Sequence, residues 1–285
     1  MQALRYLTSN QIKEASESLF NYYDPSVRWP FQPVIEGPGG FIKEAPIDAW
    51  RGGKWHKVPI LTGFNTNEGA RFVPAGAATG KEFTKFFRTL LPSLSDKDLA
   101  KLNEVYPDPL IHSSSKYKET RKGLGSQFKR MEQAYGHFAY ICPVRHTSHF
   151  AASDVPVYMY HFAVSSSVKG GADHGTHNPF PTYSQEVRDI SDTIDEVTGL
   201  MHAYWTSFIT TGDPNKIKGR FPKRPAWPMY VPEKGEGRGK VVVFGEGNDE
   251  IAGGENEGVA IKVVDDTYPA EECEYWWDRT GLFEL

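Results

Sequence analysis

The stretch that decides the fold of this chain is VPILTGFNTNEG, from Val58 to Gly69. Its first half, Val58–Gly63, is apolar nearly throughout, which is typical of a strand that helices cover on both faces. Its second half is rich in turn-forming residues and places Glu68 just past the end of the strand. Catalytic groups of open α/β sheets collect at that edge, so Glu68 is a candidate functional residue.

A second apolar run, Val155–Val164, leads into a glycine-rich loop that contains His174. Taken alone, a loop glutamate is usually solvated and a single histidine usually structural. An acid and then a histidine after successive buried strands is, however, the chain order of the α/β-hydrolase triad. In that order Glu68 accepts a hydrogen bond from one ring nitrogen of His174, and the other nitrogen takes the proton of a serine hydroxyl.

Helices are expected between and after these strands. Capping boxes that begin at Thr79 and Ser95 predict two helices, each ended by a proline, as an excursion between the acid strand and the histidine strand. An amphipathic stripe over 194–208 predicts a third helix, and Val241–Phe244 a short strand between two loops. The pattern indicates an α/β fold with a mostly parallel sheet covered by helices.

Composition excludes several classes of protein. The chain has 285 residues, a net charge of -4 and no cluster of Lys and Arg, so nucleic acid is not expected as a partner. It has no apolar run long enough to span a membrane. Residues 1–6 lack the basic start and apolar stretch of a signal peptide, so the sequence leaves the location of the protein open.

The cysteines and histidines predict no metal site and no cofactor. Cys142 and Cys273 are too far apart for a zinc ribbon or a C-x-x-C motif, and are either a disulfide pair or two buried thiols. His174 and His177 have a spacing that can bind zinc, but no cysteine or carboxylate pair nearby completes a site.

Several segments, taken in chain order, resemble the type-B carboxylesterase/lipase family, which includes the cholinesterases. They are PVIEGPGGF (33–41), VPILTGFNTNEG (58–69), GADH (171–174), YWTSF (204–208), TGDPN (211–215) and WPMY (227–230). The resemblance implies the α/β-hydrolase fold and hydrolysis of small carboxylic esters or lipid esters, with Glu68 and His174 as triad acid and base. It also implies a disulfide between Cys142 and Cys273, similar to that of cholinesterases, and full-length relatives that are commonly secreted.

The sequence departs from the family in one respect, because it contains no G-x-S-x-G elbow for the nucleophile. Ser126 and the run Ser165–Ser167 lack the flanking glycines. In the family the elbow lies in the N-terminal half, upstream of anything that resembles residues 2–6. Residues 1–285 are therefore expected to be a partial domain, the C-terminal half, without the half that bears the nucleophile.

Two hypotheses follow from this departure. In the first, the chain is part of an ester hydrolase and is inactive when isolated. In the second, it is a non-catalytic relative, either adhesion-like or orphaned, but such a role does not need Glu68 and His174. The missing half would also supply early strands of the sheet, so we expect an unpaired apolar edge that another polypeptide completes.

Overall fold

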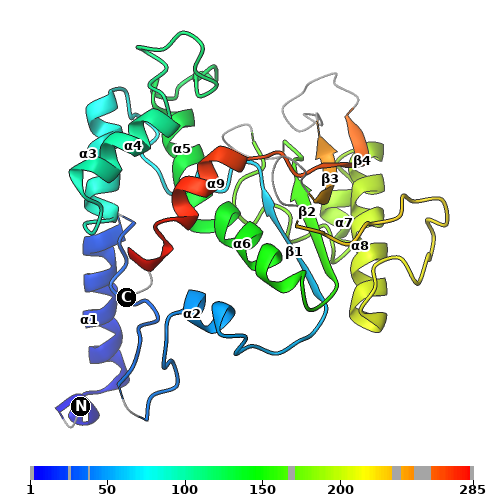
Figure 1. Ribbon diagram of the computed structural model, residues 1–285, viewed down its shortest axis with the longest axis horizontal. Coiled ribbons are helices and arrows are strands. Elements are labelled where there is room, and N and C mark those ends of the chain that lie inside the picture. The colour runs from blue at the N-terminus through cyan, green and yellow to red at the C-terminus, as the bar shows by residue number, and fades with distance from the viewer. Residues whose placement is uncertain are drawn as a thin grey trace.

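The computed structural model describes residues 3–24, 27–37, 39–165, 171–232, 239–246 and 258–282. A sheet lies at the centre (Figure 1). Stacked beside it on one side are the helices α3 (Gly80–Leu90), α4 (Asp96–Val105) and α5 (Phe128–Gly136), and on the other side lies α8 (Asp192–Thr211). The N-terminal helix α1 (Ser9–Tyr23) lies apart from the sheet, and none of its residues is buried.

The sheet found in the described residues is mixed and has the strand order β1-β2-β3-β4. Its strands are β1 (Ile60–Asn65), β2 (Val157–Phe162), β3 (Lys240–Glu246) and β4 (Val259–Asp265). The first three run parallel to one another, and β4 is antiparallel to β3. The parallel pairs agree with the expected α/β class.

Helices cover both faces of the sheet. Val157 and Met159 of β2 pack in one core cluster with residues of α6 (Cys142–Ala151). The intervening Tyr158, with its neighbours on that side, packs in a second cluster with α8 (Asp192–Thr211). Because successive side chains of a strand point to opposite faces, β2 needs apolar residues at nearly every position. Burial on both faces therefore explains why the apolar run around β2 does not alternate with polar residues.

The other helices complete the chain. They are η1 (Ala3–Tyr6), α2 (Pro46–Arg51), α3 (Gly80–Leu90), α4 (Asp96–Val105), α5 (Phe128–Gly136), the π-helical turn η3 (His137–Ile141), α7 (Gln185–Arg188), α9 (Ala270–Trp277) and η5 (Thr280–Leu282). Both predicted capping boxes are present, at Thr79 and Ser95. Helices α3, α4, α5 and α9 enclose a third core cluster that includes Phe87, Leu102 and Trp276. The predicted helical excursion is therefore confirmed.

The strand bounds differ from those expected by two residues. The run predicted to begin at Val58 pairs only from Ile60, whose N–H donates to the Pro156 carbonyl at 2.9 Å. The N–H of Val155 instead donates to Ala151, at the end of α6, so β2 starts later than expected. Strand β4 was not predicted, although its residues are apolar except for Lys262 and the terminal Asp265. Of the predicted loops around β3, residues 235–238 and 247–257 lie outside the described part of the chain.

Strand β1 forms one edge of the sheet within the described residues. It is apolar over Ile60–Leu61 and Gly63–Phe64, and its outer side has no paired strand among those residues. An apolar edge of this kind is a surface on which another strand can pair. The expected apolar edge is therefore present in the structure.

A disulfide joins Cys142 to Cys273, across 131 residues of sequence. Both residues are fully buried, and the Trp277 indole N–H donates to the Cys142 carbonyl at 2.8 Å. Of the two alternatives left open by the sequence, the bonded pair is correct. Closing so long a loop stabilises the fold by about 5 kcal/mol in the chain-entropy model.

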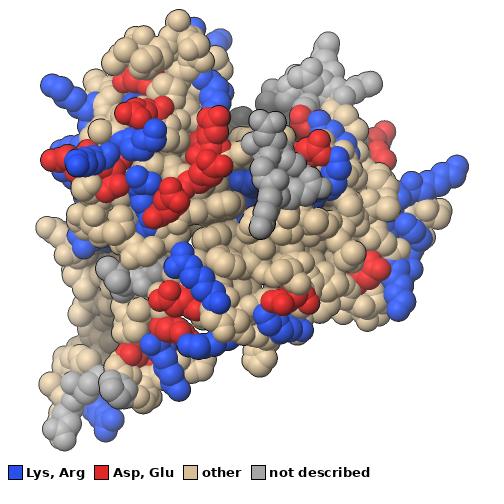
Figure 2. All heavy atoms as spheres, in the orientation of Figure 1, with Lys and Arg blue, Asp and Glu red and all other residues tan. Residues whose placement is uncertain are grey.

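The surface carries charges of both signs. Figure 2 shows acidic and basic side chains interspersed over the region of α3 and α4, and a centre of this face that is largely without charge. In the part of the chain that the structure describes, no helix is both long enough and apolar enough to cross a membrane.

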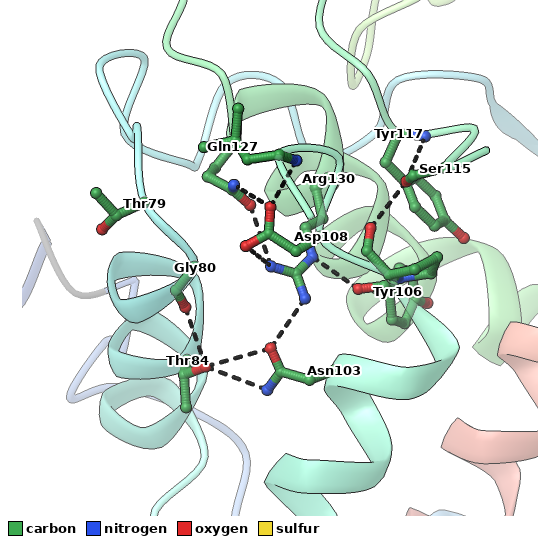
Figure 3. A network of polar contacts seen from close by, with 12 residues as sticks. Thr79, Gly80, Thr84, Asn103, Tyr106, Asp108, Ser115, Tyr117, Gln127 and Arg130 are labelled. Atoms are coloured by element: carbon green, nitrogen blue, oxygen red, sulfur yellow. Dashed lines mark hydrogen bonds and ion pairs between the residues drawn. The ribbon is translucent and has the colours of Figure 1, made fainter. Parts of the chain in front are cut away.

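Arg130 is the centre of a buried polar network that joins α4 to α5 (Figure 3). Its side chain is 1% exposed, and its Nε donates to the Tyr106 carbonyl at 2.7 Å. Its other nitrogens donate to Gln127 Oε1 at 3.1 Å and to Asn103 Oδ1 at 2.9 Å. Burial lowers the pKa of Arg130 to about 10, although the Asp108 carboxylate lies 3.5 Å away and opposes that shift. The network therefore fixes the excursion against α5.

We predict that Arg130→Met lowers the free energy of unfolding by about 3 to 5 kcal/mol, because Asp108 and a buried carbonyl lose their partner. Arg51→Met is the matched control, since its ion pair with Asp48 is exposed and contributes about 0 to 1 kcal/mol. Urea denaturation measures both variants. Equal losses in the two would contradict the importance of the buried network.

Candidate active site

The carboxylate of Glu68 lies just beyond the end of β1, as expected, and is 5% exposed. The backbone N–H of Asn65 donates to Oε1 at 2.7 Å. This contact closes a tight turn, because the donor and the acceptor are only three residues apart. A hydrogen bond from a backbone N–H to a carboxylate fixes the orientation of that carboxylate.

The imidazole of His174 reaches the other oxygen of the same carboxylate. Its Nδ1 lies 2.6 Å from Glu68 Oε2, so the two predicted site residues are in direct contact. The side chain of His174 is 43% exposed, and in the described part of the chain Nε2 has no hydrogen-bond partner. With Nδ1–H donating to the carboxylate, Nε2 carries the lone pair that can accept a proton.

Two asparagines, Asn65 and Asn67, connect the loop that carries Glu68 (residues 66–69, the acid loop) to the loop that carries His174 (residues 171–178, the histidine loop). The Asn65 amide donates to the Asp173 carbonyl at 2.6 Å. The backbone N–H of Asn67 donates to the Ala172 carbonyl at 2.9 Å, and Asn67 and Asp173 form an isolated parallel bridge. Sequence reasoning missed both asparagines, although their alternate positions beside Glu68 gave a signal.

Aromatic rings pack around His174. The ring of Tyr140 lies 4.3 Å from the imidazole, centroid to centroid, and that of Phe72 lies 5.5 Å away. Burial, aided by the charge of Glu68, raises the pKa of Tyr140 to about 12. Tyr140 belongs to the π-helical turn between α5 and α6, and such turns are frequent at functional sites. Nothing in the sequence indicated this contact, because a π-helical turn has no clear sequence signal.

Glycines allow the acid loop to lie directly against α5. A Cβ added at Gly69 would stand 2.0 Å from the Glu132 carbonyl oxygen, and one at Gly136 would stand 2.9 Å from the Gly69 nitrogen. Backbone atoms cannot move away cheaply from such an overlap. Only glycine therefore lets the loop and the helix approach this closely.

A buried polar chain supports the acid loop from behind. The Thr66 carbonyl accepts hydrogen bonds from Gln133 Nε2 at 3.2 Å and from Tyr268 Oη at 3.3 Å. His137 links this pair to Tyr106, with its Nδ1 2.8 Å from the Tyr106 hydroxyl and its Nε2 3.5 Å from Tyr268 Oη. Burial lowers the pKa of His137 to about 3, so the ring is neutral in the folded protein.

Other residues considered from the sequence lie elsewhere. His177 directs its Nε2 to the Tyr160 hydroxyl at 3.2 Å. The Ser126 hydroxyl donates to the Ala78 carbonyl at 2.8 Å. Ser166 and Ser167 lie outside the described residues. Among the residues that are described, no group of three or more His, Cys, Asp or Glu could hold a metal ion.

Comparison with known proteins gives consistent matches. The sequence profile of the carboxylesterase family matches residues 1–254. The chain is 28% identical to Secreted lipase 4 of Gibberella zeae over 281 residues, which are 98% of this chain and 46% of that protein. It is 29% identical over 231 residues to bile salt-activated lipase of Bos taurus, covering 71% of this chain and 35% of that protein.

The fold comparison agrees with these matches. The crystal structure of Aspergillus niger EstA superposes with a TM-score of 0.68 and 22% identity, covering 90% of this chain and 46% of that chain. The architecture is accordingly that of an α/β-hydrolase. The chain spans less than half the length of the relatives that it matches.

Replacement of Gly69 tests the close packing of the acid loop. We expect Gly69→Ala to lower the free energy of unfolding by about 1 to 3 kcal/mol, because the added Cβ overlaps a backbone carbonyl oxygen. Gly76→Ala is the matched control, since a Cβ there meets no atom within 4 Å. Thermal unfolding of the two variants compares them, and a Gly69 variant as stable as the control would refute the packing argument.

The buried His137 predicts a pH dependence of stability. An unfolded histidine has a pKa near about 6.5, whereas His137 in the folded protein has one of about 3. Between these values the unfolded state binds a proton that the folded state excludes. The free energy of unfolding should therefore fall as the pH drops below about 6.5, by up to about 1.4 kcal/mol per pH unit from this residue.

The variant His137→Gln should reduce that slope, and the control His112→Gln, at an exposed position, should leave it unchanged. Urea denaturation at several values between about pH 4 and about pH 7, which covers most of the interval between the two pKa values, measures the slopes. Identical slopes for wild type and His137→Gln would show that His137 does not titrate as expected.

Proposed function

Because the chain belongs to the carboxylesterase family, we propose that it supplies the acid and the base of a serine ester hydrolase. Glu68 acts as the orienting acid and His174 as the general base. The nucleophilic serine comes from a segment outside residues 1–285, and these residues form the C-terminal half of the catalytic domain. The family match over residues 1–254 and the absence of a G-x-S-x-G elbow from the sequence support this proposal.

One observation carries the proposal, namely the 2.6 Å contact between Glu68 Oε2 and His174 Nδ1. A buried carboxylate in this position holds one tautomer of the imidazole and stabilises the imidazolium that forms during the reaction. It also leaves Nε2 for the substrate side. The partial exposure of His174, at 43% of its side chain, supports access of a serine hydroxyl and an ester from that side.

The chemistry proceeds in two stages. The serine oxygen attacks the ester carbonyl carbon while His174 Nε2 takes the hydroxyl proton, and collapse of the intermediate expels the alcohol with that proton. Water then attacks the acyl-enzyme, gives a proton to Nε2, and the carboxylic acid leaves as the serine recovers its proton. Each stage needs His174 first as base and then as acid, with Glu68 holding the orientation of its ring.

The proposed substrates are carboxylic esters of small molecules or lipids. Relatives of this chain carry the names lipase and, for a protein of Mus musculus that is 27% identical over 205 residues, pyrethroid hydrolase. Aromatic rings beside His174 suit an apolar acyl or alcohol group. The Cys142–Cys273 disulfide supports an oxidising location, so we include secretion of the native protein in the proposal.

Hydrolysis of p-nitrophenyl butyrate tests the proposal on two preparations. The purified chain should show no turnover above that of its His174→Ala variant, because it lacks the nucleophile. The native protein, isolated from its own organism with an antibody against residues 1–285, should hydrolyse the ester. In that protein Glu68→Gln should lower kcat by about 10⁴, as loss of the correct tautomer does in related triads.

The two preparations also define the contradicting results. Turnover by the isolated chain that disappears in His174→Ala would place the nucleophile within residues 1–285. A native protein that neither hydrolyses the ester nor reacts with a fluorophosphonate would overturn the proposed function altogether.

A further inference from the structure

The contact between Glu68 and His174 joins two loops that lie 106 residues apart in the sequence. Neither loop can fix the separation of the two side chains alone. At 2.6 Å this separation is short, and a displacement of about 1 Å would break the hydrogen bond. The contacts that connect the loops therefore decide whether the pair forms.

Asn67, the residue before Glu68, contacts the histidine loop at two points. Its backbone N–H donates to the Ala172 carbonyl at 2.9 Å, and its side-chain Oδ1 accepts from the Ala172 N–H at 3.1 Å. A Cβ at Gly171 would stand 2.3 Å from that same Oδ1. Glycine at 171, three residues before His174 in the sequence, therefore allows the Asn67 amide to approach.

The other end of the same amide contacts α5. Its Nδ2 donates to Glu132 Oε1 at 3.0 Å, and Glu132 is fully buried. Arg121 donates to the same oxygen at 2.7 Å and pairs at 2.7 Å with Glu119. The carboxylate accepts and the Ala172 N–H donates, so the two ends of the amide are distinguished and its orientation is fixed.

We propose that Asn67 is a positioning residue. It fixes the acid loop and the histidine loop against α5 and so sets the distance between Glu68 and His174. The inference rests on the proposed function, in which that distance determines the tautomer of His174. Asn65 adds an independent link between the loops, through the Asp173 carbonyl at 2.6 Å. Replacement of Asn67 should therefore displace the pair while the fold is retained.

The test replaces Asn67 with aspartate, which has nearly the same shape. In Asn67→Asp an oxygen replaces Nδ2 and faces the Glu132 carboxylate, so repulsion should move the residue away. The readout is proton NMR of the chain, because a short hydrogen bond from Nδ1–H to a carboxylate gives a far-downfield resonance. We expect this resonance in wild type, its loss in Asn67→Asp, and a mixture of His174 tautomers in the ring nitrogen shifts of that variant.

A second substitution should restore the contact. In Asn67→Asp/Glu132→Gln the buried carboxylate that repels the new aspartate is removed, so the aspartate can return to its place and accept from the Ala172 N–H. The downfield resonance should return in this double variant. Asn178→Asp is the matched control, because it adds the same charge to the histidine loop at an exposed position that does not contact Asn67. This variant should keep the downfield resonance.

Circular dichroism verifies that each variant folds. If Asn67→Asp does not fold, Asn67→Ser removes the amide without a new charge and is expected to lose the same resonance. An unchanged resonance in the folded Asn67 variant, or no return of it in the double variant, would overturn the positioning role. This readout needs no turnover, so an inactive native protein with the expected NMR results would refute the ester hydrolase and leave the positioning role intact.

Discussion

The hydrogen bond between Glu68 and His174 is the constraint on which the rest of the site depends. It requires that two loops from distant parts of the chain meet at one edge of the sheet. Parallel pairing of β1 and β2 satisfies this requirement, because it brings the C-terminal ends of the two strands side by side. The carboxylate is buried and the imidazole is partly exposed, so the pair is fixed on one side and accessible on the other.

Helix α5 and the segment before α9 hold the acid loop in place. The loop lies against α5 through Gly69, and the Thr66 carbonyl accepts hydrogen bonds from Gln133 and Tyr268. Tyr268 precedes α9, which the disulfide of Cys273 fastens to α6. The C-terminal part of the chain is thus connected to the candidate site through a short series of buried contacts.

The sequence predicted the class of fold for physical reasons, while the roles that it predicted for Glu68 and His174 stay predictions. Buried parallel strands need apolar residues on both faces, and capping boxes satisfy free N–H groups, so Val58–Gly63 and Thr79 gave readable signals. Resemblance to a family supplied the disulfide pairing, which residue spacing left open. The sequence contained a signal for Asn67, as a polar residue beside Glu68, but not for its partners. It contained none for Tyr140, because these contacts depend on how the π-helical turn and the two loops meet in space.

The most direct measurement is the structure of the native protein after inhibition by an organophosphate ester, which forms a covalent adduct with an activated serine. We predict an adduct on a serine from outside residues 1–285, with its Oγ within about 3 Å of His174 Nε2. An adduct on a serine remote from His174, or a structure in which Glu68 and His174 are apart, would contradict the account.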